Sequence, residues 1–550
     1  MTAPAAPPPG TEVLPAPSPA PGTPPGGAPP AELRVQSTLT QPDAALASPH
    51  AHGAPCTMII LGASGDLTRR KLIPALYHLT CDGLLPAEFH VIGVAREPMT
   101  DEEFRAAMRE AVAEHGEGPV DPARWAPFAA RLAYVGGDLD DPATYVALDA
   151  RLAAIERGGA GSNGEGRGRL FHLALPPSVY EGVLVHLSES GLAARRDDPA
   201  GRPWVRIIVE KPFGRDLASA RALNAAVRAH FAEHQVFRID HYLGKDTVQN
   251  LLVFRFGNSI FEPVWTRDHI ARVEITAAEV VGVEHRAGYY EEAGVVRDMF
   301  QNHLLQLLAL TAMEPPVAFR AESVRNEKVK VLEAIRPIAP GDVARVAVRG
   351  QYGAGSIDGA PVPGYREEAG VAPRSTTATY AALRLHVDNW RWQGVPFILR
   401  SGKRLARRDT EVVIHFRRPP HMVLPHGEGQ PVEGNCLTFQ LQPEEGLSLR
   451  FQVKVPGVDM RMTSASMDFS YAAGFGAEQH SAYETLLLDA MTGDATLFTR
   501  SDAVEASWRV VDPVIQAWEE APPGDFPNYP AGTWGPAASA RLSEGEPQLP

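Results

Sequence analysis

Two short stretches of the sequence combine side chains that could bind an anion and move a proton. In the first, residues 238–245, a carboxylate, an imidazole, a phenol and an ammonium lie within six residues: Asp240, His241, Tyr242 and Lys245. A cation among several hydrogen-bonding groups suits the binding of a phosphate. The stretch therefore suggests an anion site, although Asp240 and His241 could instead merely shape a turn.

The second stretch, residues 297–306, supplies a candidate general base. His303 lies in a helical pattern that is otherwise apolar, with Met299 and Phe300 among its neighbours. A buried imidazole must find a polar partner, because an unsatisfied polar group is costly to bury, and histidine titrates near neutral pH. Asp240 could be that partner. On this pattern alone, a satisfied core histidine remains the commoner alternative to a catalytic one.

The length and composition of the chain bound what it can be. Of its 550 residues, 44% are apolar and 21% charged, which is typical of a globular protein, and the length predicts two domains. The formal net charge of −14 argues against a broad nucleic-acid-binding surface, so a local basic cluster must hold any anionic ligand. The three cysteines, Cys56, Cys81 and Cys436, have neither metal-ligand nor paired spacing, so we expect a reducing, cytoplasmic setting and no metal.

Both ends of the chain are rich in proline. The first thirty residues contain twelve prolines and no basic residue, so they lack the parts of a signal peptide and predict a disordered tail over residues 1–54. Residues 521–550 are again rich in proline and glycine and predict a loose C-terminal tail. No run between them approaches the roughly 18 consecutive apolar residues of a membrane helix, so we expect no membrane-spanning segment.

The elements that must position these side chains begin with a strand, a glycine turn and a helix. Residues 56–61 are a short apolar run, residues 62–67 read Gly-Ala-Ser-Gly-Asp-Leu, and an apolar helical pattern follows. In such a unit the glycines let the backbone approach a pyrophosphate at the helix N-terminus. The Gly-x-x-Gly spacing is one glycine short of the full dinucleotide fingerprint, so an ordinary turn capped by Ser64 or Asp66 is an even alternative.

Further strands and helices extend this unit. The expected strands are residues 89–95, 133–135, 170–175 and 205–209, the expected helices are 101–115, 142–156 and 217–233, and 158–168 is a glycine-rich surface loop. Their alternation predicts a Rossmann-like, dinucleotide-binding α/β domain over residues 55–236. Arg96 follows the second strand, where an acidic residue would contact the ribose of NAD. Arginine there favours the 2′-phosphate of NADP, although a solvated arginine is the alternative.

Lys211 and Tyr180 follow other strands of the same sheet. Ligands bind outside the carboxyl ends of strands in open α/β sheets, and Lys211 lies there, within Glu-Lys-Pro-Phe-Gly at residues 210–214. A surface lysine before a turn is common, so Lys211 alone is weak evidence. Tyr180 could face a nicotinamide, but from the residues alone a helix-start tyrosine of no catalytic interest is the preferred interpretation.

The second half of the chain alternates apolar and polar residues. The alternating segments are residues 270–276, 378–387, 411–416, 436–441 and 447–453. Such alternation predicts half-buried antiparallel strands. We therefore expect a larger α+β domain over residues 237–520, built on a mostly antiparallel sheet, with two long helices through residues 303–310 and 483–491.

Five motifs in order make the chain similar to a known family. They are residues 62–67, 210–217, 238–245, 297–303 and 394–403, the last reading Gly-Val-Pro-Phe-Ile-Leu-Arg-Ser-Gly-Lys. The chain resembles the glucose-6-phosphate dehydrogenase family over residues 58–515 or so, and only the two tails fall outside the match.

The resemblance implies oxidation of D-glucose 6-phosphate at C1 to 6-phospho-D-glucono-1,5-lactone with hydride transfer to NADP⁺, the first step of the oxidative pentose phosphate pathway. It implies that His303 is the general base and that Asp240 orients it. The substrate-binding residues that it implies are Lys211, His241, Tyr242, Lys245, Glu279, Asp298, Lys403, Arg408 and Gln442. The cofactor-binding residues that it implies are Gly62, Ala63, Ser64, Gly65, Asp66, Leu67, Arg96, Tyr180 and Lys211.

The resemblance also implies a homodimer or homotetramer joined through the large sheet. Some family members bind a second, structural NADP⁺ through basic residues of that sheet, but Asp409 and Gln440 stand where basic residues would be expected, so we do not expect that site. The alternatives are a related sugar-phosphate dehydrogenase, an enzyme that prefers NAD⁺, and a non-catalytic dinucleotide sensor. The presence of both Asp240 and His303 argues against the sensor.

Overall fold

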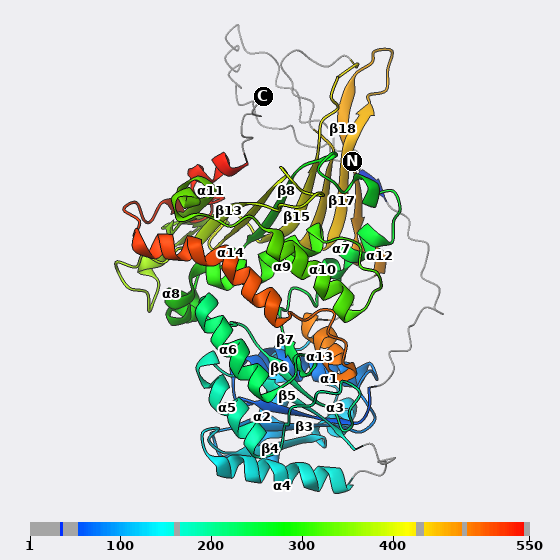
Figure 1. The fold of residues 1–550 in the computed structure, drawn as a ribbon, viewed down its shortest axis with the longest axis vertical. Helices are drawn as coiled ribbons and strands as arrows, with labels where there is room; N and C mark the ends of the chain where they lie inside the picture. Colours follow the sequence, from blue (N-terminus) through cyan, green and yellow to red (C-terminus); the bar gives the residue numbers. More distant parts are fainter. Residues whose placement is uncertain (1–33, 37–52, 159–165, 425–433, 476–480, 544–550) are drawn as a thin grey trace, which may run out of the picture.

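The computed structural model describes residues 34–36, 53–158, 166–424, 434–475 and 481–543. The two largest sheets are a parallel sheet of six strands and a sheet of nine strands. Figure 1 shows the parallel sheet in the lower part of the view and the larger sheet above it. The predicted combination of a Rossmann-like α/β domain with a larger, mostly antiparallel α+β domain is confirmed. Among the helices that the structure describes, none is both long enough and apolar enough to cross a membrane.

The parallel sheet has its first strand in the middle. Its order is β4-β3-β2-β5-β6-β7. The strands are β2 (Cys56–Leu61), β3 (Phe89–Ala95), β4 (Leu132–Gly136), β5 (Gly168–Leu173), β6 (Val205–Val209) and β7 (Val236–Arg238). The chain runs outward from β2 first to β4 and then, from β5, to β7. The strand order therefore reverses at the carboxyl end of β2, which is where open α/β sheets bind their ligands.

The described part of the parallel-sheet region has six α-helices, of which the three predicted with bounds, residues 101–115, 142–156 and 217–233, begin and end close to the predicted positions, whereas Pro122–Ala129 was not predicted. The six helices are α1 (Ile73–Cys81), α2 (Asp101–His115), α3 (Pro122–Ala129), α4 (Pro142–Gly158), α5 (Tyr180–Glu189) and α6 (Leu217–His230). Helix α2 begins at a capping box in which Thr100 and Glu103 satisfy each other's backbone N–H groups, a device that sequence reveals directly.

The large sheet has the order β1-β18-β17-β16-β15-β8-β14-β13-β9. Its strands are β1 (Arg34–Gln36), β8 (Ile270–Ala278), β9 (Ala347–Gly350), β13 (Tyr380–His386), β14 (Pro396–Gly402), β15 (Asp409–Phe416), β16 (Cys436–Gln442), β17 (Gly446–Lys454) and β18 (Met462–Ser470). Neighbours are antiparallel except for the pairs β8 with β14 and β1 with β18.

A layer of helices lies between the two sheets (Figure 1). Its members are α7 (Asp246–Phe256), α9 (Leu305–Ala312), α10 (Ala321–Ala334) and α14 (Ser501–Glu520). Helix α13 (Ala482–Thr492) comes from the C-terminal part of the chain but packs against α1 of the parallel-sheet region. The two regions are therefore in direct contact, and the loops between them can form one site.

The prediction of a disordered N-terminal tail is wrong for three residues. Strand β1 pairs with β18, with Arg34 opposite Ser466 and Gln36 opposite Asp468. The outer edge of a sheet offers unpaired backbone groups that readily accept another strand, and composition alone does not reveal this opportunity. Residues 1–33 and 37–52 lie outside the described part of the chain, as do residues 159–165 of the predicted glycine-rich loop.

The prediction of a loose C-terminal tail is wrong for residues 521–543. Strand β19 (Tyr529–Pro530) pairs with β10 (Tyr352–Gly353), and Tyr529 is 3% exposed. Its hydroxyl donates to the backbone carbonyl of Lys403 at 2.8 Å, across 126 positions of sequence. The prolines and glycines of this segment predict a loop, but its contacts with residues far away in the sequence hold it in a defined structure. Residues 544–550 lie outside the described part of the chain.

Candidate active site

His303 and Asp240 meet in the interior of the protein. A π-helix, Val296–Leu304, carries His303, and the loop that follows β7 carries Asp240. Nδ1 of His303 lies 2.5 Å from Oδ1 of Asp240, and the two residues are 1% and 2% exposed. Oδ1 of Asp240 also accepts the backbone N–H of Tyr242 at 3.0 Å. The structure thus joins the two stretches in which the sequence placed an anion site and a base.

The neighbours of His303 determine which of its nitrogens carries the proton. Because an ionised Asp240 only accepts, Nδ1–H of His303 donates to it. Lys211 Nζ lies 2.9 Å from Nε2 of His303 and has only protons to offer, so Nε2 presents its lone pair. Lys211 also donates to the backbone carbonyl of Asp298 at 3.1 Å. This tautomer of His303 is the one that can accept a proton at Nε2.

The electrostatics of the pair favour a neutral imidazole beside a carboxylate. Burial and the Lys211 charge lower the pKa of His303, against the charge of Asp240, which raises it. Burial alone would raise the pKa of Asp240, but the charge of His303 holds that pKa below its usual range. At neutral pH the pair therefore has an ionised acid and a base ready to take a proton.

Aromatic and cationic side chains surround the pair. The ring of Tyr242 stacks on His303 with centroids 4.2 Å apart, the His241 ring lies edge-on to His303, and Lys245 Nζ lies 4.4 Å from the Tyr242 ring centre. Lys245 directly precedes α7, whose N-terminus carries the positive end of the helix dipole. Burial, aided by the Arg408 charge, lowers the pKa of Lys245 to about 8. The charge and hydrogen-bonding groups of these side chains are suited to binding an anion.

Carboxylates and a further lysine lie on another side of His303. Lys403 Nζ donates to Oε2 of Glu279 at 2.7 Å, and the hydroxyl of Tyr289 donates to Oδ1 of Asp298 at 3.1 Å. Burial would raise the pKa of Asp298, but the charges of Lys211 and Lys403 hold it at about 2. Ionised carboxylates accept hydrogen bonds only, so Glu279 and Asp298 suit the hydroxyl groups of a sugar.

Arg408 and Gln442 lie at neighbouring ends of β15 and β16. Arg408 is exposed and precedes β15, and Gln442 is half-buried opposite Thr410. Beside them, Nε2 of Gln440 donates to Oδ1 of Asp409 at 2.6 Å. Asp409 and Gln440 stand where basic residues would bind a second cofactor, and they form a hydrogen bond with each other instead.

The backbone at Ala174 packs closely against the glycine turn that follows β2. Gly62 has a φ of +95°, and a Cβ there would lie 2.2 Å from the backbone oxygen of Ala174, so only glycine fits. A Cβ on Gly65 would meet the carbonyl of Gly62 at 3.1 Å. Ala63 is buried and Leu67 half-buried, so the turn exposes mainly its backbone and small side chains. This is the surface that a pyrophosphate can approach.

The end of β3 lies beside this turn. Oγ of Ser64 donates to Glu97 at 2.8 Å, and the preceding Arg96 is exposed. Neither Ser64 nor Asp66 caps the helical turn Thr68–Leu72, so the alternative of an ordinary capped turn is not supported. Residues 62–67 and Arg96 therefore fit the phosphates of a dinucleotide.

Tyr180 is buried in the interior of the protein. It is the first residue of α5, its side chain is fully buried, and its hydroxyl donates to the backbone carbonyl of Glu210 at 3.2 Å. The hypothesis that its side chain faces a nicotinamide is therefore not supported, and the helix-start interpretation fits better. Tyr180 supports the residue before Lys211 instead.

Among the described residues, one group of potential metal ligands includes the His303–Asp240 pair. Asp240, His241 and His303 each offer an atom of ligand type within 4.8 Å of the others. Because Asp240 and Nδ1 of His303 already bond each other and Lys211 contacts Nε2, the arrangement suits proton transfer better than metal binding.

Two tyrosines support the site without any local signal in the sequence. Tyr289 holds the carboxylate of Asp298, and Tyr529 holds the backbone of Lys403. Neither belongs to one of the five motifs, and only the folded chain brings them to their partners. A tyrosine inside a proline-rich segment gave no reason to expect a role at the site.

Comparisons with known proteins begin at residue 59, where the resemblance was predicted to begin, but run on to residue 548, so the prediction that the C-terminal segment falls outside the match is wrong. The family described as "Glucose-6-phosphate dehydrogenase, NAD binding domain" matches residues 59–250, and "Glucose-6-phosphate dehydrogenase, C-terminal domain" matches residues 252–548. Glucose-6-phosphate 1-dehydrogenase of Aggregatibacter actinomycetemcomitans is 49% identical over 487 residues, which is 88% of this chain and 95% of that protein. The enzyme of that name from Treponema pallidum (strain Nichols) is 46% identical over 494 residues, 90% and 94% of the two chains.

Solved structures agree with the sequence comparisons. Glucose-6-phosphate dehydrogenase in complex with its substrate glucose-6-phosphate has a TM-score of 0.79 at 36% identity and covers 89% of this chain and 97% of its own. The glucose-6-phosphate 1-dehydrogenase of Mycobacterium avium has a TM-score of 0.74 at 37% identity and covers 90% and 100%. The resemblance carried by the five motifs is confirmed: this chain is an oxidoreductase that belongs to the glucose-6-phosphate dehydrogenase family.

Proposed function

We propose that the chain oxidises D-glucose 6-phosphate at C1 to 6-phospho-D-glucono-1,5-lactone, passing hydride to NADP⁺, with His303 as general base and Asp240 as its orienting carboxylate. The observation that carries the proposal is the buried pair itself, with Nε2 of His303 turned to Lys211 beside the anion site. Family membership supports the substrate and the reaction, and the glycine turn with Arg96 supports the cofactor.

The geometry supplies the proton-transfer half of the reaction. Nε2 of His303 accepts the proton of the C1 hydroxyl. Without substrate, Lys211 Nζ lies 2.9 Å from Nε2, and the C1 hydroxyl replaces Nζ there when the substrate binds. The ionised Asp240 stabilises the imidazolium that forms. NADP⁺, when bound, supplies the acceptor for the C1 hydride. Proton transfer to a positioned base contributes about 10²–10⁴-fold to the rate.

The remaining rate enhancement comes from orientation. His241, Tyr242 and Lys245 hold the phosphate, and Glu279 and Asp298 accept hydrogen bonds from the sugar hydroxyls. These contacts are remote from the bond that breaks, so their binding energy serves to place C1 within reach of the base and the hydride acceptor. Lys211, once displaced from Nε2, bridges the substrate and the cofactor side.

The test is the rate of reduced-cofactor formation with glucose 6-phosphate, run with NADP⁺ and with NAD⁺ and repeated with unphosphorylated glucose. We expect fast NADP⁺ reduction only with the phosphate ester. Equal rates with glucose would contradict the role of the anion site, and no reduction with either cofactor would make the chain a dinucleotide sensor.

Arg96→Ala is expected to raise the KM for NADP⁺ about tenfold and to leave the KM for NAD⁺ within twofold or so, because only NADP⁺ loses a charge-assisted contact with its 2′-phosphate. A tenfold change in KM is at the lower end of what a charge-assisted hydrogen bond contributes, because Arg96 is exposed and water screens its charge. Arg109→Ala, on the outer face of α2, is the matched control. Equal losses for both cofactors would show that Arg96 does not read the 2′-phosphate.

We also propose the finer organisation of the molecule. Residues 55–236 bind the dinucleotide, residues 237–520 bind the sugar phosphate and join subunits, and the packed segment 521–543 completes the second unit.

The protein is a cytoplasmic homodimer or homotetramer. Strand β17 is half-buried along all but its last residue, and Met467 and Phe475 are 49% and 56% exposed, which is typical of an uncovered interface. Light scattering after size exclusion measures the mass, and a monomer would contradict the proposal.

A further inference from the structure

Helix α14 contacts the segments that carry Lys211, Asp240 and His303. It packs against α6 of the parallel-sheet region and against the π-helix that carries His303. The side chains of α14 that form polar contacts with these neighbours are Glu505, Trp508, Asp512 and Glu519. Their spacing of three, four and seven residues is typical of one face of a helix. A single face of α14 therefore reaches several parts of the site.

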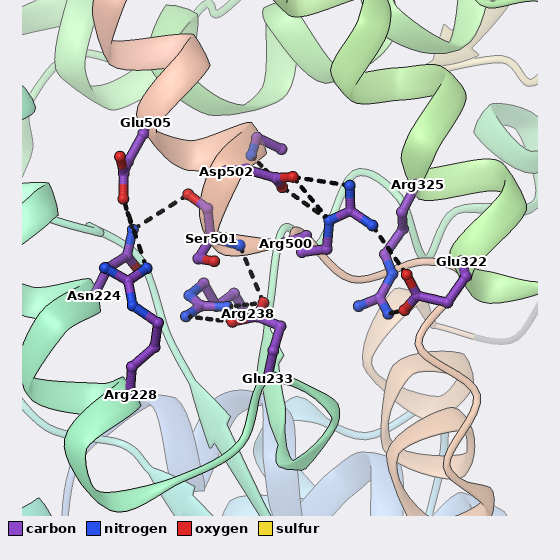
Figure 2. Close-up of polar contacts among 11 residues, drawn as sticks. Asn224, Arg228, Glu233, Arg238, Glu322, Arg325, Arg500, Ser501, Asp502 and Glu505 are labelled. Carbon is purple, nitrogen blue, oxygen red and sulfur yellow. Dashed lines mark hydrogen bonds and ion pairs between the residues drawn. The ribbon is translucent and has the colours of Figure 1, made fainter. Parts of the chain in front are cut away.

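The start of α14 holds the end of β7, two residues before Asp240. The backbone N–H of Thr499 donates to the carbonyl of Arg238 at 3.1 Å. The buried side chain of Arg238 pairs with Glu233 at 2.6 Å, and Glu233 accepts the backbone N–H of Ser501 at 3.0 Å (Figure 2). The backbone and the side chain of the last strand residue are thus fixed to the same short segment.

The same end of α14 is joined to α6. Nδ2 of Asn224 donates to the backbone carbonyl of Ser501 at 3.2 Å and to Oε1 of Glu505 at 3.1 Å (Figure 2). Asn224 is buried, so water competes little for these hydrogen bonds. The start of α14 therefore has a fixed place relative to the parallel-sheet region.

The middle of α14 holds the loop that carries Lys211. Nε1 of Trp508 donates to the backbone carbonyl of Phe213 at 2.9 Å, and Oδ2 of Asp512 accepts the backbone N–H of Leu217 at 2.7 Å. Trp508 is 1% exposed and Phe213 is 4% exposed. A buried carbonyl that loses its donor is costly, so the indole N–H fixes the loop two residues beyond Lys211.

The far end of α14 reaches the start of the π-helix. Nη2 of Arg297 donates to Oε1 of Glu519 at 2.8 Å, and Nε of Arg297 donates to the backbone carbonyl of Arg215 at 2.8 Å. Arg297 therefore joins the helix that carries His303 both to α14 and to the loop that carries Lys211.

Lys211 is the side chain whose placement depends most on these contacts. Its Nζ lies 2.9 Å from Nε2 of His303 and 3.1 Å from the backbone carbonyl of Asp298. A lysine reaches its partners through a long, flexible stem. The backbone of the loop must therefore be fixed if the ammonium is to lie in one place.

We propose that α14 sets the relative positions of Lys211, Asp240 and His303, and that Trp508 is the positioning residue for Lys211. The inference rests on the proposed role of Lys211 at the substrate. It adds to the site a helix that none of the five motifs includes.

The test is a double-mutant cycle that combines Trp508→Phe with Lys211→Met. Trp508→Phe keeps an aromatic ring but removes the donor to Phe213. We expect kcat/KM for glucose 6-phosphate, per folded enzyme, to fall about tenfold, since a misplacement of about 1 Å can cost up to about 10²-fold. In the Lys211→Met background we expect a further loss of less than about twofold, because the ammonium that Trp508 positions is absent.

Trp392→Phe is the matched control. Trp392 is fully buried, and its Nε1 also donates to a backbone carbonyl, that of Ala312, at 2.8 Å. Its acceptor lies at the end of α9 rather than in the loop that carries Lys211. Any loss of kcat/KM in Trp392→Phe should therefore be the same with Lys211 and with methionine in its place.

The outcomes separate this inference from the proposed function. An unchanged kcat/KM in Trp508→Phe, or equal losses in both backgrounds, would overturn the positioning role and leave the proposed function intact. No turnover in the unsubstituted enzyme would overturn both together. Asp512→Ala removes the acceptor at the other end of the loop and should show the same dependence on Lys211, so it carries the test if Trp508→Phe does not fold. If neither variant folds, α14 is a structural element and the positioning role is overturned.

Discussion

The His303→Asn variant is expected to lose at least about two orders of magnitude in kcat while its KM for glucose 6-phosphate stays within about threefold. Asparagine can still occupy the space beside Asp240, but it cannot accept the proton of the C1 hydroxyl. The phosphate and hydroxyl contacts come from other residues, so binding should survive. Initial rates of NADPH formation at saturating NADP⁺ give both constants.

Two further variants make this prediction specific. Asp240→Asn should also lower kcat strongly, because an amide neither fixes the tautomer of His303 nor stabilises its imidazolium. The double variant should lose no more than the worse single one, since the two residues act as a unit. His115→Asn, at the end of α2, is the control for a histidine outside the site. A kcat near that of the unsubstituted enzyme in His303→Asn would rule out the assigned base.

In Lys245→Gln the KM for glucose 6-phosphate is expected to rise about 10²-fold, the upper range for loss of a hydrogen bond to a charged group. Lys245 lies over Tyr242 and at the start of α7, where a phosphate would contact the ammonium and the helix N-terminus together. Burial lowers the pKa of Lys245 to about 8, so the group is still mostly charged at neutral pH, and a bound dianion would raise this pKa and hold the proton in place. Measuring KM at several salt concentrations should also show a weaker salt dependence in the variant.

The unphosphorylated sugar distinguishes this role from a structural one. Lys245→Gln and the unsubstituted enzyme should oxidise glucose at the same low rate, because glucose has no phosphate to lose. A parallel fall with both substrates would show that Lys245 shapes the site rather than binding the phosphate. Lys454→Gln, at the exposed end of β17, is the matched control and should leave both rates unchanged.

The strands were predictable because their signals are local. The apolar runs at residues 56–61, 89–95 and 205–209 form β2, β3 and β6 with those bounds, since a strand buried on both faces needs no polar residue. The alternating segments of the second half likewise lie in strands of the large sheet, with bounds shifted by a few residues. Helix α14 was missed, and Pro513 within it interrupts the local helical signal.

The His303–Asp240 pair could be suggested from sequence because a histidine in an apolar helix requires a partner, and an acid in a motif was available. Its pairing still needed the fold, since 63 positions separate Asp240 from His303. For Tyr180 the prediction and the structure differ. The resemblance implied that it binds the cofactor, but in the structure its hydroxyl donates to the backbone carbonyl of Glu210.

Tyr529 connects the segment after residue 520 to the loop that carries Lys403. Its hydroxyl holds the carbonyl of Lys403, and the N–H of Gly532 donates to the carbonyl of Arg404 at 2.8 Å, so the loop that presents Lys403 is fastened by residues near the end of the chain. A ribosome makes Tyr529 126 residues after Lys403. A nascent chain can therefore contain His303, Asp240 and Lys403 and still lack the two hydrogen bonds that hold the Lys403 loop. A proteolytic cut after residue 520 would remove the same two hydrogen bonds while leaving His303, Asp240 and Lys403 in the chain.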